Sequence, residues 1–153
     1  MKKLFLLLLF IFAGLSGCER DDICIDDSTP HLVIRFYDVT DTTLVKSVDQ
    51  LSVKILEIEA NYISNNTTDS IAIPLISSAN FTKFVLTNES NSDTITLNYT
   101  PEAVFVGRSC GFKSIFNNLD LLVTDDGENW IQSFNIISQQ IENETSAHVK
   151  IFH

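Results

Sequence analysis

Apolar and polar residues alternate along two stretches of the chain with the period of two that marks a half-buried β-strand. In Thr94–Tyr99 every second residue is apolar or aromatic, and Ser146–Phe152 repeats this pattern through Val149 and Ile151. Further stretches are rich in β-branched and aromatic residues, which favour the pleated surface of a sheet. These strand candidates are His31–Asp38, Leu51–Ala60, Ile71–Ile76, Phe81–Thr87, Ala103–Arg108, Asp120–Thr124 and Trp130–Ser138. Polar clusters separate them, so the pattern predicts short strands joined by turns.

Three segments give a different or mixed signal. The Leu, Lys and Glu content of Leu51–Ala60 would also suit a helix. Asp125–Asn129 is typical of a hairpin turn, in which Gly127 supplies a positive φ. Four apolar residues after Cys110 fall at helical spacing and predict one short helix. These four residues are Phe112, Ile115, Phe116 and Leu119.

This number of short strands in a domain that begins near Pro30 predicts an all-β fold. We expect residues 30–153 to form an antiparallel two-sheet sandwich of immunoglobulin-like type, with a small β-barrel as the alternative. The Cys–Trp–Cys arrangement of immunoglobulin domains is missing, because Trp130 follows both Cys24 and Cys110. The sandwich prediction therefore depends on strand number and alternation alone.

The N-terminal residues 1–17 have the order of a secretory signal peptide. Two lysines precede the unbroken apolar run Leu4–Phe12, which then tapers into small residues and is short for a bilayer span. A buried helix or a membrane anchor helix is the alternative interpretation. The polar chain that follows at once favours the signal peptide.

The end of this segment, Leu15-Ser16-Gly17-Cys18, resembles the bacterial lipobox. The resemblance implies cleavage before Cys18 and attachment of a diacylglycerol to its sulfur, with an N-acyl chain on its amino group. Each buried methylene of such chains contributes about 0.8 kcal/mol, so two or three chains give a stable membrane anchor. Residues 18–29 would then be a lipidated acidic tether, and the membrane would be a partner through this lipid.

The acidic residues of this tether allow more than one interpretation. The plain one is a solvated spacer whose like charges repel. The stretch Glu19–Asp22 is also similar in charge to the export signal that surface lipoproteins of the Bacteroidota carry after their lipidated cysteine. Calcium binding has little support, because the spacing of a calcium loop is absent. The expected location is therefore the outer membrane, on its surface or its periplasmic face.

Cys24 and Cys110 are the cysteines that remain once Cys18 is acylated. An exported chain meets an oxidising compartment, where an even pair of cysteines is normally bridged. We therefore predict a Cys24–Cys110 disulfide, with two free thiols as the alternative. A metal site is disfavoured because neither cysteine has a second ligand at C-x-x-C spacing.

Charge and motif content exclude several classes of function. The formal net charge of −10 disfavours nucleic acid, which selects clustered Lys and Arg. The sequence contains no nucleophile elbow, phosphate-binding loop or zinc-protease motif, and its three histidines lie far apart. We therefore expect no catalytic residues, no metal and no cofactor, with solvated histidines. Trp130 is a candidate either for core packing or for a sugar-stacking platform.

Four short motifs resemble the Asp-Ser/Thr-apolar signal that Bacteroidota use for O-glycosylation of exported proteins. They follow Asp27, Asp41, Asp69 and Asp93 in the sequence. The resemblance makes their hydroxyl residues candidate acceptors, at positions expected in turns or at strand edges. These candidates are Ser28, Thr42, Ser70 and Thr94.

The segments "CERDDICI", "LVIRFYD", "SCGF", "WI" and "AHVKIF" together resemble a family of short, uncharacterised Bacteroidota lipoproteins. The resemblance implies a lipid-anchored envelope protein with a single domain and adds no activity. Our leading hypothesis is a non-catalytic binding module for an envelope protein or glycan. The alternatives are an accessory subunit of an outer-membrane assembly and, least favoured, a small hydrolase that uses carboxylates.

Overall fold

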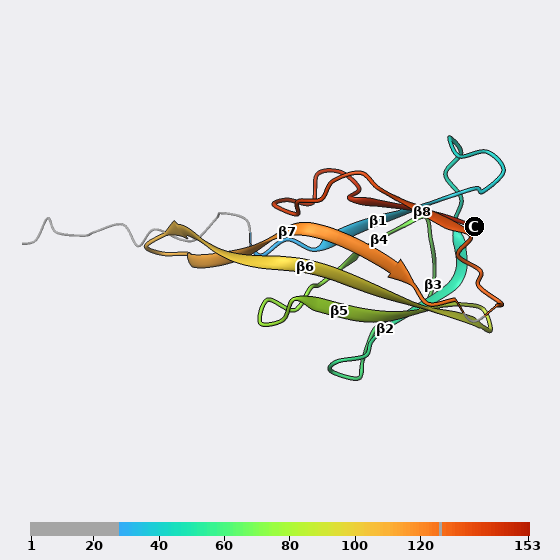
Figure 1. The fold of residues 1–153 in the computed structure, drawn as a ribbon, viewed down its shortest axis with the longest axis horizontal. Helices are drawn as coiled ribbons and strands as arrows, with labels where there is room; N and C mark the ends of the chain where they lie inside the picture. Colours follow the sequence, from blue (N-terminus) through green and yellow to red (C-terminus); the bar gives the residue numbers. More distant parts are fainter. Residues whose placement is uncertain (1–27, 126) are drawn as a thin grey trace, which may run out of the picture.

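The computed structural model describes residues 28–125 and 127–153, which contain nine β-strands and no helix. The expected signal peptide and nearly all of the expected tether lie outside these residues. The strands are β1 (Leu32–Tyr37), β2 (Val48–Ile55), β3 (Ala60–Thr68), β4 (Ser70–Ile73), β5 (Phe81–Asn88), β6 (Asn91–Gly107), β7 (Gly111–Val123), β8 (Ser133–Ile136) and β9 (Val149–Phe152). Figure 1 shows them in two layers, with β6 and β7 reaching well beyond the other strands.

The strands form two separate sheets, which confirms the predicted all-β, two-sheet sandwich in place of a closed barrel. One sheet has the order β4-β1-β9-β8, and the other has the order β3-β2-β5-β6-β7. Every pairing is antiparallel except that of β1 with β9. These two strands come from opposite ends of the described chain, so no hairpin joins them and a parallel pairing is open to them.

The core lies between the two sheets and is built from alternate residues of their strands. Leu32, Ile34 and Phe36 of β1 are fully buried, as are Phe84 and Leu86 of β5 on the opposite sheet. The intervening side chains of these strands are partly or fully exposed, with few exceptions. Burying one such aliphatic or aromatic side chain contributes about 1.5–3 kcal/mol. The period-two pattern in the sequence therefore encodes the inner faces of the sandwich.

The short helix predicted after Cys110 is wrong, because these residues form β7. The helical spacing of the apolar residues has a different cause. Asn118 has a positive φ of 55°, and the β6–β7 register shifts between the Asn98 and Thr100 pairings, opposite this residue. Such a β-bulge adds one residue to a strand and reverses the alternation of its faces. Two strand segments out of phase then imitate a helical period.

The predicted hairpin turn at Asp125–Asn129 is also wrong, although the positive φ of Gly127 is confirmed at 86°. β7 and β8 belong to different sheets, so the loop between them crosses the sandwich. This loop carries Trp130, which is only 8% exposed and packs on Phe36 with ring centroids 6.2 Å apart. Trp130 is therefore a core residue and does not provide a sugar-stacking platform.

The segment between β2 and β5 is more regular than its sequence indicates. Leu51–Ala60, which also suited a helix, contains most of β2, and the polar residues after it continue β3 to Thr68. β3 is an edge strand whose side chains are largely exposed. Ile63 of β3 packs against the core, whereas most other side chains of this strand are exposed, so polar residues can occupy their positions.

A buried hydrogen-bond network fixes the connection between β4 and β5 against β6. The Tyr99 hydroxyl lies 2.6 Å from the Thr82 hydroxyl, donates to the Ile76 carbonyl and accepts from the Ile76 amide, both at 3.0 Å. Burial raises the pKa of Tyr99, which keeps this hydroxyl protonated. The network ties three chain segments together.

We expect Tyr99→Phe to lower the free energy of unfolding by about 1–2 kcal/mol, because it removes the hydrogen bonds of a buried hydroxyl to Ile76 and Thr82. Urea denaturation followed by circular dichroism measures this change. Tyr62→Phe is the matched control, since Tyr62 is 43% exposed on β3. Equal stability of the two variants would contradict the role of the network.

Candidate functional site

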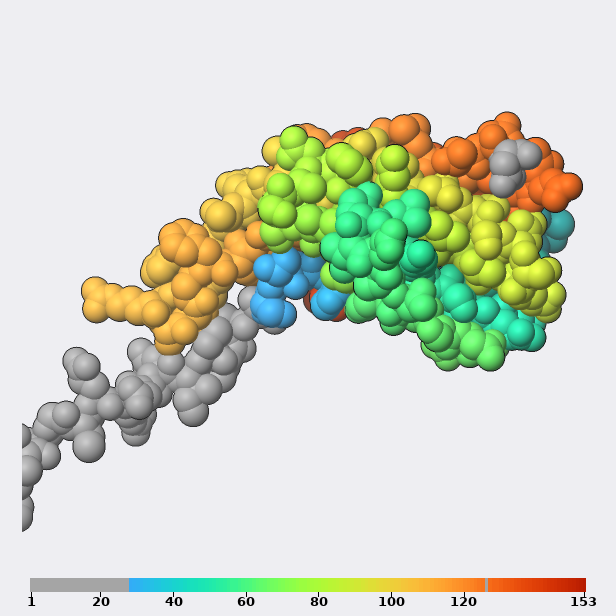
Figure 2. Space-filling model, turned by 90° about the horizontal axis from the view of Figure 1, so that it is seen from below, coloured from blue at the N-terminus to red at the C-terminus, as the bar shows by residue number. Residues whose placement is uncertain are grey.

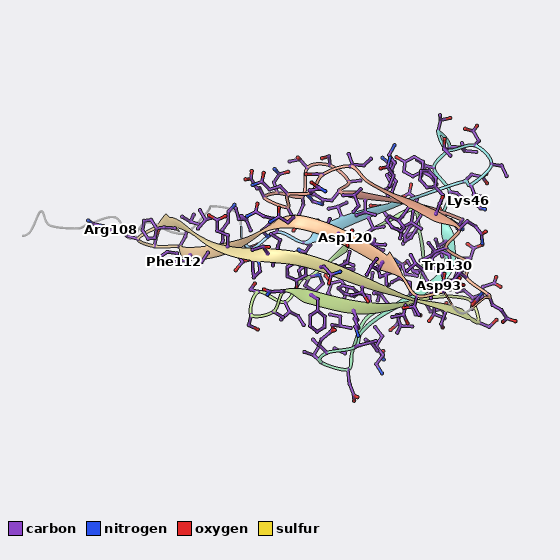
Figure 3. The ribbon with its side chains drawn as sticks, in the orientation of Figure 1. Lys46, Asp93, Arg108, Phe112, Asp120 and Trp130 are labelled. Atoms are coloured by element: carbon purple, nitrogen blue, oxygen red, sulfur yellow. The ribbon has the colours of Figure 1, made fainter. Side chains whose placement is uncertain are left out.

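The most distinctive feature of the molecule is a projecting two-stranded arm. β5 pairs with β6 only as far as Asn98, whereas β6 and β7 continue to pair with each other up to Gly107 and Gly111. We define the arm as residues 102–115, with its turn at Arg108–Cys110. Figure 3 places Arg108 and Phe112 at one end of the long axis of the molecule and Trp130 near the other end. The arm thus presents its tip away from the core.

The tip of the arm carries an exposed aromatic pair. Phe105 and Phe112 are direct cross-strand partners, and their ring centroids lie 5.3 Å apart in an edge-to-face arrangement. A cross-strand pair of this kind stabilises a two-stranded ribbon by about 0.2–1 kcal/mol. Phe105 nevertheless remains 58% exposed and Phe112 69% exposed. Two large apolar side chains together at the end of a projection form a surface suited to contact with another apolar phase.

The charge of the arm differs from that of the whole chain. The arm contains Glu102, Arg108 and Lys113, which gives it a net charge of +1, whereas the whole chain has −10. Arg108 is exposed in the turn itself. The tip therefore combines apolar rings with positive charge on an otherwise acidic protein.

The first described residues lie against the arm. The Thr29 hydroxyl accepts a hydrogen bond of 3.0 Å from the backbone amide of Ser114 in β7. Figure 2 shows these first residues (blue) next to the base of the arm (gold). The chain therefore approaches the domain from the side of the arm.

Of the three cysteines, the structure places only Cys110, whose side chain is not free. Cys18 and Cys24 lie outside the described residues, so the lipidation and the Cys24–Cys110 pairing stay predictions. Cys110 belongs to the turn of the arm. Among the described residues, no helix is long and apolar enough to cross a bilayer.

The four candidate glycosylation sites differ in accessibility. Ser28 and Thr42 are exposed outside the strands. Ser70 is partly buried in β4, where its hydroxyl donates to the Ile34 carbonyl at 3.3 Å, and Thr94 is partly buried in β6 opposite Val85. Ser28 and Thr42 are thus the acceptors that an enzyme would reach in the folded domain. Their modification stays a prediction.

Two of the histidines, His31 and His148, make hydrogen bonds with residues that are distant in the sequence. The Nδ1 atom of His31 lies 2.6 Å from a carboxylate oxygen of Glu144. The expectation of a solvated His148 is wrong: this residue is 4% exposed, and its Nδ1 accepts a hydrogen bond of 3.0 Å from the Val33 amide. Within residues 28–125 and 127–153, no group of three or more His, Cys, Asp or Glu residues is arranged to hold a metal.

Protonation of His148 should destabilise the fold in mildly acidic solution. Burial lowers the pKa of His148 below its ordinary value of 6.5, against the opposing effects of a backbone hydrogen bond with Asn143 and of the charge of Glu144. Burial likewise lowers the pKa of His153. The unfolded chain therefore binds more protons than the folded chain just below 6.5, so stability rises with pH in this window.

We expect the free energy of unfolding to decrease as the pH falls from about 7 to 5. His148→Asn keeps an acceptor for the Val33 amide and should remove part of this slope, and adding His153→Asn should remove most of the remainder. Urea denaturation at a series of pH values measures the slope. An unchanged slope in the double variant would contradict this assignment.

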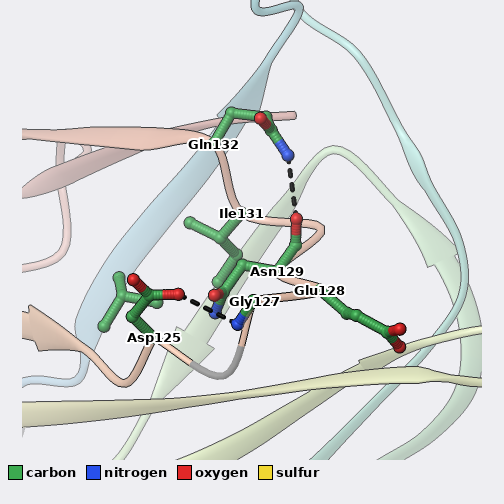
Figure 4. A pocket seen from close by; sticks show the side chains of 7 residues that line it. Asp125, Gly127, Glu128, Asn129, Ile131 and Gln132 are labelled. Atoms are coloured by element: carbon green, nitrogen blue, oxygen red, sulfur yellow. Dashed lines mark hydrogen bonds between the residues drawn. The ribbon is translucent and has the colours of Figure 1, made fainter.

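Two shallow pockets lie toward the end of the molecule opposite the arm. The larger, about 470 Å³, is formed by the loop after β7. Asp125 accepts a hydrogen bond of 3.0 Å from the Gly127 amide, and Gln132 donates to the Asn129 carbonyl at 2.8 Å. Figure 4 shows the Asp125 carboxylate turned toward the Gly127 amide and the Glu128 carboxylate pointing away from Asp125. These two acids therefore do not form the facing pair of carboxyl groups that catalyses glycoside hydrolysis.

The second pocket, about 430 Å³, lies beside Trp130 and His153. Its rim includes Lys46, whose ammonium group donates to the His153 carbonyl at 2.8 Å. Nearby, the buried carboxylate of Asp93 accepts a hydrogen bond of 2.7 Å from the Ile131 amide, which fixes the crossing loop on β6. These polar contacts hold the end of the sandwich together.

Residues 50–153, more than half of the chain, match the family of unknown function DUF6452. The chain belongs to this family. It matches no curated protein and no solved structure. The prediction of an uncharacterised family is confirmed in this form, whereas the lipoprotein character and the bacterial group stay predictions. The DUF6452 match includes the whole arm and begins within β2, so β1 lies outside it.

The arm of this DUF6452 member is not among the elements predicted from the sequence. The sequence pattern predicts a strand at Ala103–Arg108 but a helix around Phe112. A hairpin signal was nevertheless present, because two apolar segments flank a short turn bounded by Gly107 and Gly111. Gly111 has a positive φ of 71°, as such a turn requires.

Proposed function

We propose that this protein is a lipid-anchored protein of the cell envelope that works as a non-catalytic binding module. The observation that carries the proposal is the segment Leu15–Cys18, which has the residues and the position of a lipobox. An acylated Cys18 would hold the domain at the outer membrane without a spanning segment. A Cys24–Cys110 disulfide is part of the same proposal, since it requires an exported chain.

The contact between the first described residues and the arm supports this arrangement. Thr29 binds Ser114, so the tether would leave the domain beside the arm. Cys24 stands five residues before Thr29, and an extended segment of this length reaches up to about 17 Å. Cys110 stands four strand residues from Ser114, at about 13 Å. The two sulfurs are within reach of each other.

The roles of the titratable side chains support binding rather than catalysis. His31, His148 and Asp125 make the structural contacts described above. A catalytic site brings such groups together in a concave pocket with room for a substrate. Here they are distributed over different loops and strands. An envelope protein or glycan is therefore the class of partner that we propose.

Cys18→Ser should release the protein from the membrane, because it removes the only thiol in the lipobox. Fractionation of cells, with the protein detected in the membrane and soluble fractions, measures this release. The intact mass of the wild-type chain should equal residues 18–153 plus the acyl groups and any sugar on Ser28 or Thr42.

Cys24→Ser is the matched control, because it removes a nearby thiol and leaves the lipobox unchanged. This variant should stay in the membrane fraction. Membrane retention of Cys18→Ser, or a mature chain that starts elsewhere, would refute the anchor.

A further inference from the structure

We propose that the tip of the arm inserts its two phenylalanine rings into the interface of the membrane that holds the lipid anchor. This inference rests on the proposed anchor and adds an orientation of the domain relative to the membrane. The arm points toward the bilayer, and the Trp130 end is directed away from it. The occupant of the exposed aromatic surface is thus lipid, not a second protein.

The aromatic pair has the exposure and the position that this role requires. Phe105 and Phe112 expose more than half of their surface next to the turn of a two-stranded projection. Burying an aromatic side chain of this size contributes about 1.5–3 kcal/mol. Two rings alone would bind a bilayer weakly, but an anchored domain is already at the surface and needs only a preferred orientation.

The charge of the arm favours its contact with an anionic lipid surface. Arg108 and Lys113 give the arm a positive net charge, and the complete chain carries −10. Each cationic side chain near an anionic lipid surface contributes about 1 kcal/mol, whereas acidic surfaces are repelled. The positive net charge of the arm therefore favours its approach to an anionic bilayer.

The tether is short enough to keep the arm close to the membrane surface that holds the lipid anchor. Cys18 stands eleven residues before Thr29, which sets an upper limit of about 40 Å between the lipid and the base of the arm. If Cys24 is bridged to Cys110, only six residues separate the lipid from the tip, or about 20 Å when extended. The anchor and the rings would then meet the bilayer side by side.

Fluorescence quenching by lipid tests this inference. We would reconstitute the acylated full-length protein in vesicles of phosphatidylethanolamine and phosphatidylglycerol, with and without brominated acyl chains. Phe112→Trp places an indole at the tip, and Leu122→Trp is the matched control, because Leu122 is 55% exposed on the same strand within the main sheet. Wild-type protein supplies the emission of the buried Trp130. Flotation of the vesicles reports the anchor independently.

Insertion predicts that the indole at position 112 loses emission in the brominated vesicles and that the indole at position 122 does not. Several results would overturn it in protein that floats with the vesicles: no quenching at position 112, equal quenching at both positions, or a blue-shifted position-112 emission that bromine leaves unchanged. The last result would mean that protein covers the rings, either the tether or a second copy. Protein that does not float refutes the anchor, and the inference falls with it.

Discussion

A chain that starts at Gln50, where the family match begins, is expected not to fold. This truncation removes β1, which lies between β4 and β9 in its sheet. It also removes four fully buried side chains, Leu32, Ile34, Phe36 and Val48. At about 1.5–3 kcal/mol for each side chain, this loss is comparable with the whole stability of a typical domain, about 5–15 kcal/mol.

The loss of backbone pairing makes this effect larger. Without β1, β4 has no partner strand, and β9 keeps only β8. A sheet reduced to one short hairpin does not stay folded by itself in water. The inner face of the five-stranded sheet would then be exposed, because nothing else covers it.

Near-ultraviolet circular dichroism and thermal unfolding of residues 50–153 test this expectation. Trp130 reports directly, since it packs on Phe36 in the intact domain. A chain that starts at Ser28, the first described residue, is the control and should unfold cooperatively. Cooperative unfolding of the shorter chain would show that the sandwich is complete without β1.

The sequence predicted those parts of the fold that depend on local alternation. Thr94–Tyr99 and the strand around Val149 have one buried and one open face, so burial of one face leaves a period of two. The prediction failed where the backbone breaks this period. The bulge at Asn118 made a strand resemble a helix, and the polar edge strand β3 has no apolar face to detect.

The candidate site was less predictable because it depends on pairings between distant residues. The sequence predicted a disulfide for Cys110 but could not show that this residue lies in the turn of an arm. Nor could it show that Phe105 and Phe112 meet across that turn, since the register is set by the sheet. His148 was misjudged for the same reason: the Val33 amide that binds it comes from the opposite end of the described chain.

Removal of the proposed disulfide is the second change with a large expected effect. Cys110→Ser should lower the free energy of unfolding by about 4 kcal/mol, because the Cys24–Cys110 link closes a loop of about 85 residues and restricts the unfolded chain. The contact between Thr29 and Ser114 supports this pairing, since it brings the two segments together four to five residues from the sulfurs.

Urea denaturation of four proteins separates the disulfide from other effects of the substitution. Cys24→Ser and the double variant should each be as unstable as Cys110→Ser, because the loss of either cysteine removes the same disulfide. A reductant should lower the stability of the wild-type protein to the same level and leave the three variants unchanged. Wild-type stability in Cys24→Ser would instead assign the partner of Cys110 to Cys18, and a thiol used there could not carry lipid. The same measurement therefore tests the anchor from the opposite side, since an acylated Cys18 leaves Cys24 as the only available partner.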